Sequence, residues 1–406
     1  MKKFFCSLFA LLFFFTGVAF VGKQFSDKPV APTDEKETMK AIWISQYDIK
    51  NVLVSRQKTE VRRMLGVIFD NCVSLGFDTV ILQVRPNGDS LYPSEIFAPS
   101  AYAVGEYGGE FSYDPFAAAV ELARERGLSV HAWINPLRLM KPNEIVKIDP
   151  HNILRRWYAE NKYIVEHEGR LYLDPAYPEV RDLIADGALE VARKYDIDGV
   201  HMDDYFYPHG ISENFDNASY SMFGGALSLP DFRRENITKL VQNINVSLKS
   251  YSPDLIFGIS PGGNLETLFN TDYADVEEWC RGGYLDYLCP QIYFGMEHET
   301  HAFDEVYLRW RSISRSENVE LFVGITFGKA ENASMGIGDK YAGTGKNEWL
   351  DSRRVLADCL DFLKENGEPD GIFVFCYQYF FDPVSGEKNK KTEEELDNFL
   401  PVWKDF

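Results

Sequence analysis

Two adjacent carboxylates at the end of a short apolar run are the clearest chemical feature of this chain. The run Gly199–Met202 leads directly into Asp203 and Asp204. Three aromatic side chains follow them, Tyr205, Phe206 and Tyr207. Because like charges repel, one of the two carboxyls is expected to keep its proton near neutral pH in a partly dry cleft. Such a pair beside aromatic rings fits the hydrolysis of a sugar bond. The alternative is that Asp204 caps a turn and Asp203 meets an arginine.

The elements that must position this pair are predicted from alternating patterns along the rest of the chain. Short runs rich in β-branched and aromatic residues predict eight strands: Ala41–Ser45, Thr79–Val84, Ser129–Ile134, Gly199–Met202, Ile256–Ser260, Tyr287–Ile292, Leu321–Thr326 and Gly371–Cys376. Amphipathic segments between them predict helices: Thr59–Leu75, Pro115–Arg126, Glu179–Tyr195, Asp231–Lys249, Phe303–Ser314 and Ser352–Glu365. Strict alternation indicates parallel strands with helical crossovers. Eight repeats, without a glycine-rich dinucleotide motif, favour a closed (β/α)₈ (TIM) barrel of the α/β class.

Three long loops follow predicted strand ends, at Pro86–Asp114, Pro136–Pro178 and Tyr205–Pro230. In barrels of this class the active site forms at the carboxyl ends of the strands, where such loops lie. No sequence repeat suggests a separate binding module. We therefore expect residues 39–406 to form one catalytic domain with long loops around its site.

Polar and aromatic residues gather at the predicted strand ends. Period-two alternation places Gln83 and Arg85 on the same inward side, and His131 on the same side as Trp133. Amides, arginines and aromatic rings around a carboxyl pair suit a ligand rich in hydroxyl and acetamido groups. We predict that the substrate is bound by Trp43, Gln83, Arg85, Asn87, His131, Trp133, Asn135, Arg138, His201, Tyr205, Tyr207, Asn264, Gln291, Tyr293, Tyr377 and Gln378.

Several of these residues have a structural interpretation as well. Trp43 and Trp133 could fill the barrel interior, and Arg85 could neutralise one carboxylate of the pair. His131 and His201 could be inner-layer histidines with satisfied hydrogen bonds. A metal-dependent hydrolase using these two histidines and Asp203 is a further alternative, although seven scattered histidines in the whole chain make a weak case.

Composition limits the partners of the chain. Its formal net charge of -20 disfavours nucleic acid and anionic membrane surfaces, because both need a basic face. Beyond Cys6, the spacing of Cys72, Cys280, Cys289, Cys359 and Cys376 matches neither a disulfide framework nor a zinc site, and small buried thiols are expected. We predict a monomer that needs no metal and no cofactor and acts on a polysaccharide.

The N-terminal residues are typical of export. Lys2 and Lys3 precede an uncharged apolar run from Phe4 to Gly22. Residues 1–22 therefore predict a signal peptide or an uncleaved membrane anchor, and residues 23–38 predict a polar linker. We expect an exported protein whose membrane contact is made only through this N-terminal segment.

Four stretches of the chain resemble a known family. They are Gln83–Asp89, His131–Arg138, Asp198–Pro208 and Pro290–Tyr293, and they resemble blocks of the bacterial glycosyl-hydrolase-like family ten. The resemblance extends from Met39 to the last strand. It implies a (β/α)₈ barrel in exported or lipid-anchored proteins, with glycosidase activity on cell-wall glycan, notably peptidoglycan strands stripped of their peptides. The chain departs from many members in lacking a lipid-attachment cysteine.

The family's strand-four block corresponds to Asp203 and Asp204. The predicted seventh strand ends at Thr326 without a carboxylate, which argues against a nucleophile at that position. Our hypothesis is substrate-assisted hydrolysis, in which Asp203 orients the acetamido group of the sugar and Asp204 is the general acid, or the reverse. Glu266 and Glu297 are the rival second carboxylates. The alternative function is a non-catalytic carbohydrate-binding barrel on the cell surface.

Overall fold

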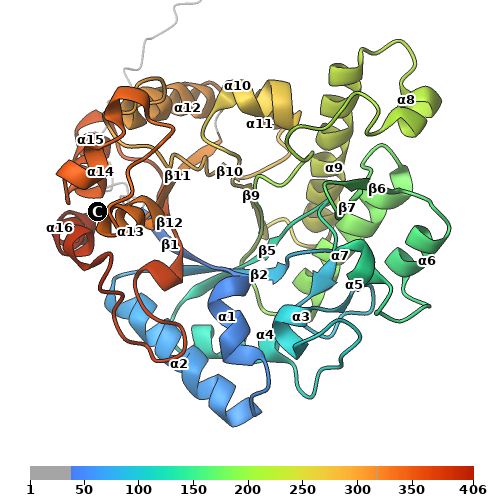
Figure 1. Cartoon of the computed structure of the whole chain (residues 1–406), viewed down its shortest axis with the longest axis horizontal. Coiled ribbons are helices and arrows are strands. Elements are labelled where there is room, and N and C mark those ends of the chain that lie inside the picture. The colour runs from blue at the N-terminus through green and yellow to red at the C-terminus, as the bar shows by residue number, and fades with distance from the viewer. Residues whose placement is uncertain (1–37, 318) are drawn as a thin grey trace, which may run out of the picture. The chain divides into compact units, whose positions relative to one another are not determined.

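Eight parallel strands close into a barrel in the computed structural model of the chain (Figure 1), which describes residues 38–317 and 319–406. In neighbour order they are β1 (Met39–Ile44), β12 (Gly371–Phe375), β11 (Glu320–Thr326), β10 (Tyr287–Leu288), β9 (Ile256–Ile259), β8 (Gly199–Met202), β5 (Ser129–Ile134) and β2 (Thr79–Arg85). The predicted (β/α)₈ barrel is thereby confirmed. The predicted N-terminal signal or anchor and nearly all of the predicted linker, residues 1–37, lie outside the described residues.

Helices follow the strands and cover the outside of the barrel. The predicted helices are present as α2 (Lys58–Ser74), α4 (Pro115–Arg124), α7 (Pro178–Lys194), α9 (Leu229–Tyr251), α12 (Phe303–Glu317) and α15 (Val355–Asn366). Their starts follow local chemistry, since Asp114 accepts a hydrogen bond from Ala117 N just before Pro115, and Ser228 caps α9 in the same way. Their apolar stripes pack against the outward side chains of the strands in one continuous cluster that includes Ile68 and Val80.

The barrel interior is a second cluster, made largely of aromatic side chains. It contains Ala41, Trp43, Ile81, Trp133, Tyr287, Cys289, Phe322, Phe373 and Cys376. The rings of Tyr287 and Phe322 stack with centroids 4.4 Å apart. Tyr287 crosses directly over Gly258 of β9, where any Cβ atom would overlap its ring. This layer closes the barrel beneath the carboxyl ends of the strands.

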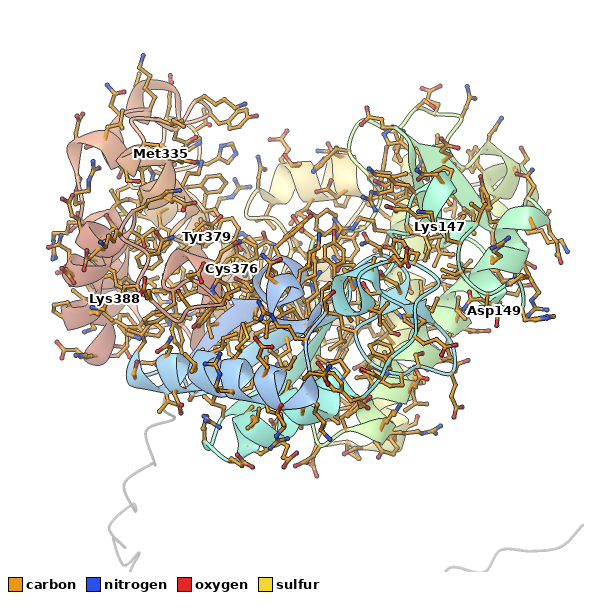
Figure 2. The ribbon with its side chains drawn as sticks, turned by 60° about the horizontal axis from the view of Figure 1, so that its bottom comes forward. Lys147, Asp149, Met335, Cys376, Tyr379 and Lys388 are labelled. Atoms are coloured by element: carbon orange, nitrogen blue, oxygen red, sulfur yellow. The ribbon has the colours of Figure 1, made fainter. Side chains whose placement is uncertain are left out.

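Further short elements lie in the connections. They are α1 (Gln46–Leu53), β3 (Asp89–Ser90), β4 (Ala98–Pro99), α3 (Ala101–Val104), α5 (Pro142–Ile145), α6 (Ile153–Ala159), β6 (Ile164–His167), β7 (Arg170–Leu173), α8 (Asn217–Phe223), α10 (Leu265–Thr267), the π-helix η1 (Leu268–Asp272), α11 (Val276–Arg281), α13 (Gly328–Ser334), η2 (Gly343–Gly345), α14 (Glu348–Asp351), η3 (Tyr377–Tyr379) and α16 (Glu393–Lys404). The antiparallel pair β6–β7 and helix α8 belong to two of the predicted long loops and lie near each other in Figure 1. Met335, after α13, and Lys147, after α5, lie on opposite sides of the barrel (Figure 2).

Two strands differ from the sequence prediction for local reasons. Strand β10 was expected to reach Ile292 but ends at Leu288, because Pro290 has no N–H group to donate to a neighbouring strand. Strand β2 has a bulge after Gln83. As a result Gln83 pairs with Trp133 of β5 but Arg85 pairs with Ile134, so Gln83 and Arg85 no longer point to the same side. The expectation that Arg85 points inward beside Gln83 is therefore wrong.

The described cysteines are all free and buried: Cys72, Cys280, Cys289, Cys359 and Cys376. This agrees with the prediction of small buried thiols. None of the helices within residues 38–317 and 319–406 is both long enough and apolar enough to cross a bilayer.

Candidate active site

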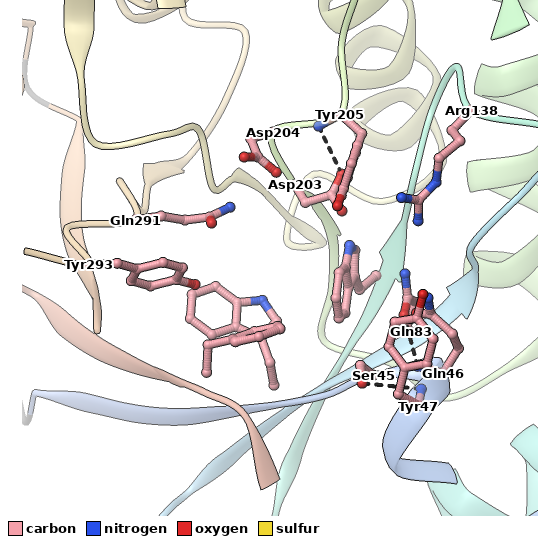
Figure 3. Close-up of a pocket in the computed structure, with 13 residues that line it drawn as sticks. Ser45, Gln46, Tyr47, Gln83, Arg138, Asp203, Asp204, Tyr205, Gln291 and Tyr293 are labelled. Atoms are coloured by element: carbon pink, nitrogen blue, oxygen red, sulfur yellow. Dashed lines mark hydrogen bonds between the residues drawn. The ribbon is translucent and has the colours of Figure 1, made fainter. Parts of the chain in front are cut away.

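A cavity of about 250 Å³ opens at the carboxyl ends of the barrel strands (Figure 3). Its lining comes from residues that follow or end β1, β2, β5, β8, β10 and β12. They are Trp43, Ser45, Gln46, Tyr47, Gln83, Trp133, Arg138, Asp203, Asp204, Tyr205, Gln291, Tyr293 and Phe375. The predicted acid pair thus shares one cavity with seven of the predicted substrate-binding residues: Trp43, Gln83, Trp133, Arg138, Tyr205, Gln291 and Tyr293.

Asp203 is the deeper member of the pair and is oriented by a row of hydrogen bonds. Its Oδ1 accepts from Tyr205 N at 3.2 Å, and its Oδ2 accepts from Asn135 Nδ2. Asn135 Oδ1 in turn accepts from Gln83 Nε2 at 2.6 Å, and Gln83 Oε1 accepts from Gln46 N at 2.9 Å. This fixes Asp203 against β5, β2 and β1, although Asn135 itself lies behind the cavity wall.

Asp204 is half-buried and points toward Gln291 on the other side of the cavity (Figure 3). Burial raises the pKa of both carboxyls. For Asp203 the pKa rises to about 7, mainly through burial and then through the charge of Asp204, against the opposing effect of Arg138. Two interacting carboxyls lose their protons in two steps that belong to the pair. The pair therefore keeps one proton at near-neutral pH.

Arg138 and Tyr205 form one wall of the cavity. The Arg138 guanidinium carbon lies 4.0 Å from the centroid of the Tyr205 ring, and Arg138 Nε donates to Pro86 O at 3.2 Å. This fixes a positive charge close to Asp203, which favours the ionised form of that carboxyl. The wall therefore combines a flat aromatic surface with a positive charge that favours ionised Asp203, the form that accepts hydrogen bonds.

The two predicted histidines lie in the barrel interior below the cavity. His201 Nε2 accepts from Trp43 Nε1 at 3.2 Å, so its proton is on Nδ1, which lies 2.7 Å from the Tyr287 hydroxyl. The same hydroxyl is 3.3 Å from His131 Nδ1. Burial lowers the pKa of His131 to about 4 and that of His201 in the same direction. Both are neutral inner-layer residues, and His201 contacts Trp43 directly.

Other predicted binding residues are placed away from this cavity. Arg85 is buried over the ring of Phe97, with its guanidinium carbon 4.7 Å from the ring centroid, in space left by Gly187 of α7. It does not neutralise the acid pair, because the charges that act on it are those of Tyr92, Glu190 and Asp89. Asn87 accepts a hydrogen bond from Arg170 Nη1 at 3.0 Å.

The remaining predicted residues have partners elsewhere. Tyr207 packs against Phe215, with ring centroids 6.0 Å apart. Asn264 caps α10. Tyr377 accepts from Asn71 Nδ2 of α2 at 2.9 Å, outside the barrel. Gln378 N donates to the buried Asp48 at 2.8 Å. The rival carboxylates Glu266 and Glu297 are exposed, and neither lines the cavity.

The sequence prediction did not include Ser45, Gln46, Tyr47 and Phe375, which line the cavity, or Asp272, on which the charge of Asp204 acts. Ser45 and Asp48 form a capping box at the start of α1, a pattern visible in the sequence. Asp272 is the last residue of η1 and is buried, with Oδ1 3.1 Å from His209 Nδ1. Burial and the charge of Asp204 raise its pKa to about 7, against the opposing effect of His209. No sequence pattern predicted this one-turn helix.

Comparison with known proteins gives a family match over most of the chain. The sequence profile of the family described as glycosyl hydrolase-like 10 matches residues 38–342. Glycosyl hydrolase YngK of Bacillus subtilis (strain 168) is 33% identical over 329 residues, covering 75% of this chain and 63% of that protein. Glycosyl hydrolase DigH of Escherichia coli (strain K12) is 31% identical over 345 residues, covering 76% of this chain and 77% of that protein. The chain thus spans less than two thirds of the Bacillus relative.

Solved structures share the fold. The glycoside hydrolase domain of PgaB (BpsB) from Bordetella bronchiseptica superposes with a TM-score of 0.55 at 12% identity, over 89% of this chain and 99% of that one. The catalytic domain of β-amylase from Paenibacillus polymyxa gives 0.53 at 11% identity, over 90% and 98%. At such identities the likeness concerns the barrel alone.

Proposed function

The chain belongs to the glycosyl hydrolase-like 10 family and is classed with the glycosidases, and on that premise we propose that it hydrolyses O-glycosidic bonds in peptidoglycan strands that lack stem peptides. The observation on which this rests is the pair Asp203–Asp204, which shares a proton inside an aromatic cavity. Glycoside hydrolysis requires a proton donor and a second carboxylate, and an adjacent pair fits the substrate-assisted form of the reaction.

The walls of the cavity support a sugar ligand. Trp43, Trp133, Tyr293 and Phe375 line the cavity with aromatic rings, against which the apolar faces of sugar rings pack. Gln291 offers an amide whose Nε2 is already bonded to Ser260 O at 3.0 Å, so its oxygen remains for a ligand donor. A cavity of about 250 Å³ accommodates a bare sugar better than one with a branched peptide attached.

The geometry favours Asp203 as the orienting group and Asp204 as the acid. Asp203 is fixed by Asn135 and Tyr205 N, and in its ionised form it accepts the N–H of the sugar's acetamido group. The acetamido oxygen then bonds to the anomeric carbon, the glycosidic C–O bond breaks, and Asp204 donates its proton to the leaving oxygen. Water next attacks the anomeric carbon, the bond from that carbon to the acetamido oxygen breaks and restores the acetamido group, and the water gives a proton to Asp204.

The structure of the seventh barrel strand supports this assignment. Strand β11 ends at Thr326, and Phe327 and Gly328 follow it, so this strand end brings no carboxylate into the cavity. A direct protein nucleophile opposite the acid would have to come from elsewhere. The substrate's own acetamido group fills that role in the proposed mechanism.

Product analysis by mass spectrometry tests the proposal. Purified glycan strands, with and without stem peptides, are incubated with the full-length chain and with the variants Asp203→Asn, Asp204→Asn, Glu266→Gln and Glu297→Gln. We expect cleavage of bare strands, a loss of at least about 100-fold in rate for either aspartate variant, and little change for the glutamate variants. De-N-acetylated strands should not be cleaved.

Two outcomes would contradict parts of the proposal. If Glu297→Gln abolishes cleavage and Asp203→Asn does not, the assisted mechanism is wrong. If the wild type binds bare strands without cleaving them, the chain is a glycan-binding barrel and the acid pair is a ligand contact.

A further inference from the structure

A second cavity, of about 500 Å³, lies between the β6–β7 hairpin and helix α8, apart from the site described above. Its lining mixes aromatic rings with side-chain amides and hydroxyls. It comprises Asn161, Tyr163, Ile164, Val165, Asp174, Tyr177, Asn214, Phe215, Asp216, Asn217, Ala218 and Ser221. Convergent amides beside ring faces are the composition expected for a ligand with many hydroxyl and amide groups.

Tyr163 has an unusual backbone conformation in this lining. Its φ is 61°, and that of Asn161 is 53°, in the left-handed region that bulky residues rarely adopt. Such strain persists where the surroundings impose it, often at binding sites. Here two edge-to-face contacts fix the Tyr163 ring, one to Trp157 and one to Tyr177, each with centroids 4.8 Å apart. The ring is a rigid part of the cavity wall.

The amides on the opposite wall are available for a ligand. Asn214 and Asn217 are exposed, and within the described residues their side chains form no hydrogen bond to protein. Asn217 begins α8, whose exposed end includes Phe223, 5.5 Å from Tyr177 between ring centroids. Free amides on one wall and fixed rings on the other can bind a sugar by its edge and by its face.

The charges around the cavity exclude an anionic ligand. The residues that line it include no lysine, arginine or histidine among those described. Asp216 is paired with the buried Arg233, with Oδ1 2.6 Å from Nη2. Asp174 is also buried, and burial raises its pKa to about 6. Phosphate or carboxylate groups would find no positive partner here, whereas uncharged hydroxyl and acetamido groups would find hydrogen-bonding partners.

We propose that this cavity is an accessory site that binds neutral, N-acetylated sugar units of a glycan strand. Two contacts connect its surroundings with those of the candidate active site: Arg138, which lines the active site, forms a backbone bridge with Tyr172 of β7, and Tyr207, three residues after Asp204, packs on Phe215. The inference takes its ligand class from the proposed function. A second point of contact would keep the protein on a long strand between cleavage events.

Affinity electrophoresis tests the site with glycol chitin, a soluble polymer of N-acetylglucosamine units. The full-length chain with Asp204→Asn is run in native gels with and without the polymer, beside the same chain with Ala218→Trp or Met222→Trp added. Ala218 lines the cavity, and a tryptophan there fills it. Met222 lies on the same helix, is 66% exposed and does not line the cavity, so it is the matched control.

We expect the polymer to retard the parent chain and the Met222→Trp chain equally, and Ala218→Trp to weaken apparent affinity by about tenfold. Equal retardation of all three chains, or no retardation of the parent, would overturn the inference. Circular dichroism melting checks that both tryptophan variants are folded. The gel measures binding alone. A failure to cleave bare peptidoglycan strands would therefore refute the proposed hydrolysis and leave the evidence for the accessory site unchanged.

Discussion

At the scale of single residues, Asn135 determines the geometry of the acid pair. It donates to Asp203 Oδ2 and accepts from Gln83, so it connects the carboxyl to β2. Replacing Asn135 by alanine removes a hydrogen bond to a charged group, and we expect kcat to fall about 10- to 100-fold. The alkaline limb of the pH profile should move upward, because Asp203 loses a donor that favours its ionised form. Gln83→Ala, one step farther away, should show a smaller effect of the same sign, and equal kinetics for wild type and Asn135→Ala would refute the positioning role.

The pH dependence of hydrolysis follows from the same pair. The pKa of Asp203 is raised from 3.8 to about 7, and that of Asp204 is also raised. Because the two carboxyls share their protons, the pair loses its last proton as the pH passes about 7, and Asp204 then has no proton to give to the leaving oxygen. We expect kcat/KM to fall above about pH 7, and to fall again in acid as both carboxyls become protonated. Initial rates on bare strands between pH 4 and about 9 measure this, and an alkaline limb near pH 4 would contradict it.

Residue-level prediction succeeded where side-chain direction follows from strand alternation. Gln83, Trp133 and Asn135 face inward as period two requires. Arg85 fails the same rule, because a single bulged residue reverses its direction. Asp272 could not be predicted, since its buried position, on which the charge of Asp204 acts, depends on a π-helix that no local pattern signals.

At the scale of elements, the contact between β9 and β10 limits substitution sharply. Tyr287 lies against Gly258, and a Cβ atom there would overlap the ring that also bonds His201. Gly258→Ala should lower the free energy of unfolding by about 1–3 kcal/mol or prevent folding, because the tightly packed interior cannot shift the ring. Urea unfolding followed by circular dichroism measures this.

Gly262 supplies a matched control for that substitution. It lies a few residues farther along the chain, just after β9. A Cβ atom there would have Leu268 Cδ2, at 3.8 Å, as its nearest neighbour. Gly262→Ala should stay within about 0.5 kcal/mol of the wild type. If the two alanine variants prove equally stable, the packing argument for Gly258 is wrong.

Strands and helices each have a distinct spacing of apolar residues, and a (β/α)₈ barrel alternates the two kinds of element along the whole domain. Their order was therefore predictable. Strand β10 is the exception, since Pro290 interrupts the ladder that its apolar run suggested. The hairpin β6–β7 and helix α8 were not predicted. Their residues are partly exposed, so the strong alternation that marks a buried strand or helix is absent.

At the scale of the whole molecule, buried carboxyls make stability depend on pH. Burial raises the pKa of Asp48 to about 6, that of Asp174 to about 6 and that of Glu395 to about 7, from ordinary values of 3.8, 3.8 and 4.5. Their contribution is fully present below the ordinary values and is lost as the pH rises through 6 to 7. The net charge of -20 adds repulsion in the same direction.

We therefore expect the chain to melt about 5 °C higher at pH 5.5 than at pH 8. Glu395→Gln keeps an acceptor for Leu356 N, now 2.7 Å from Glu395 Oε1, and removes one titrating group. This variant should show a smaller difference between the two pH values. Thermal melting in matched buffers measures both effects, and a higher melting temperature at pH 8 would refute the linkage.

Beneath the acid pair, the barrel interior offers no group that would take up a proton from it. Among the described residues there, Tyr287 and His201 are buried and neutral, and the pKa of His131 is near 4, so none accepts a proton at neutral pH. Exchange between the pair and solvent runs through the cavity mouth. If a glycan strand binds as we propose and covers the mouth, the pair keeps the protonation state that it had when the strand bound. The pH of the medium then determines what fraction of binding events leads to cleavage. It no longer affects the rate of bond breaking after the strand has bound.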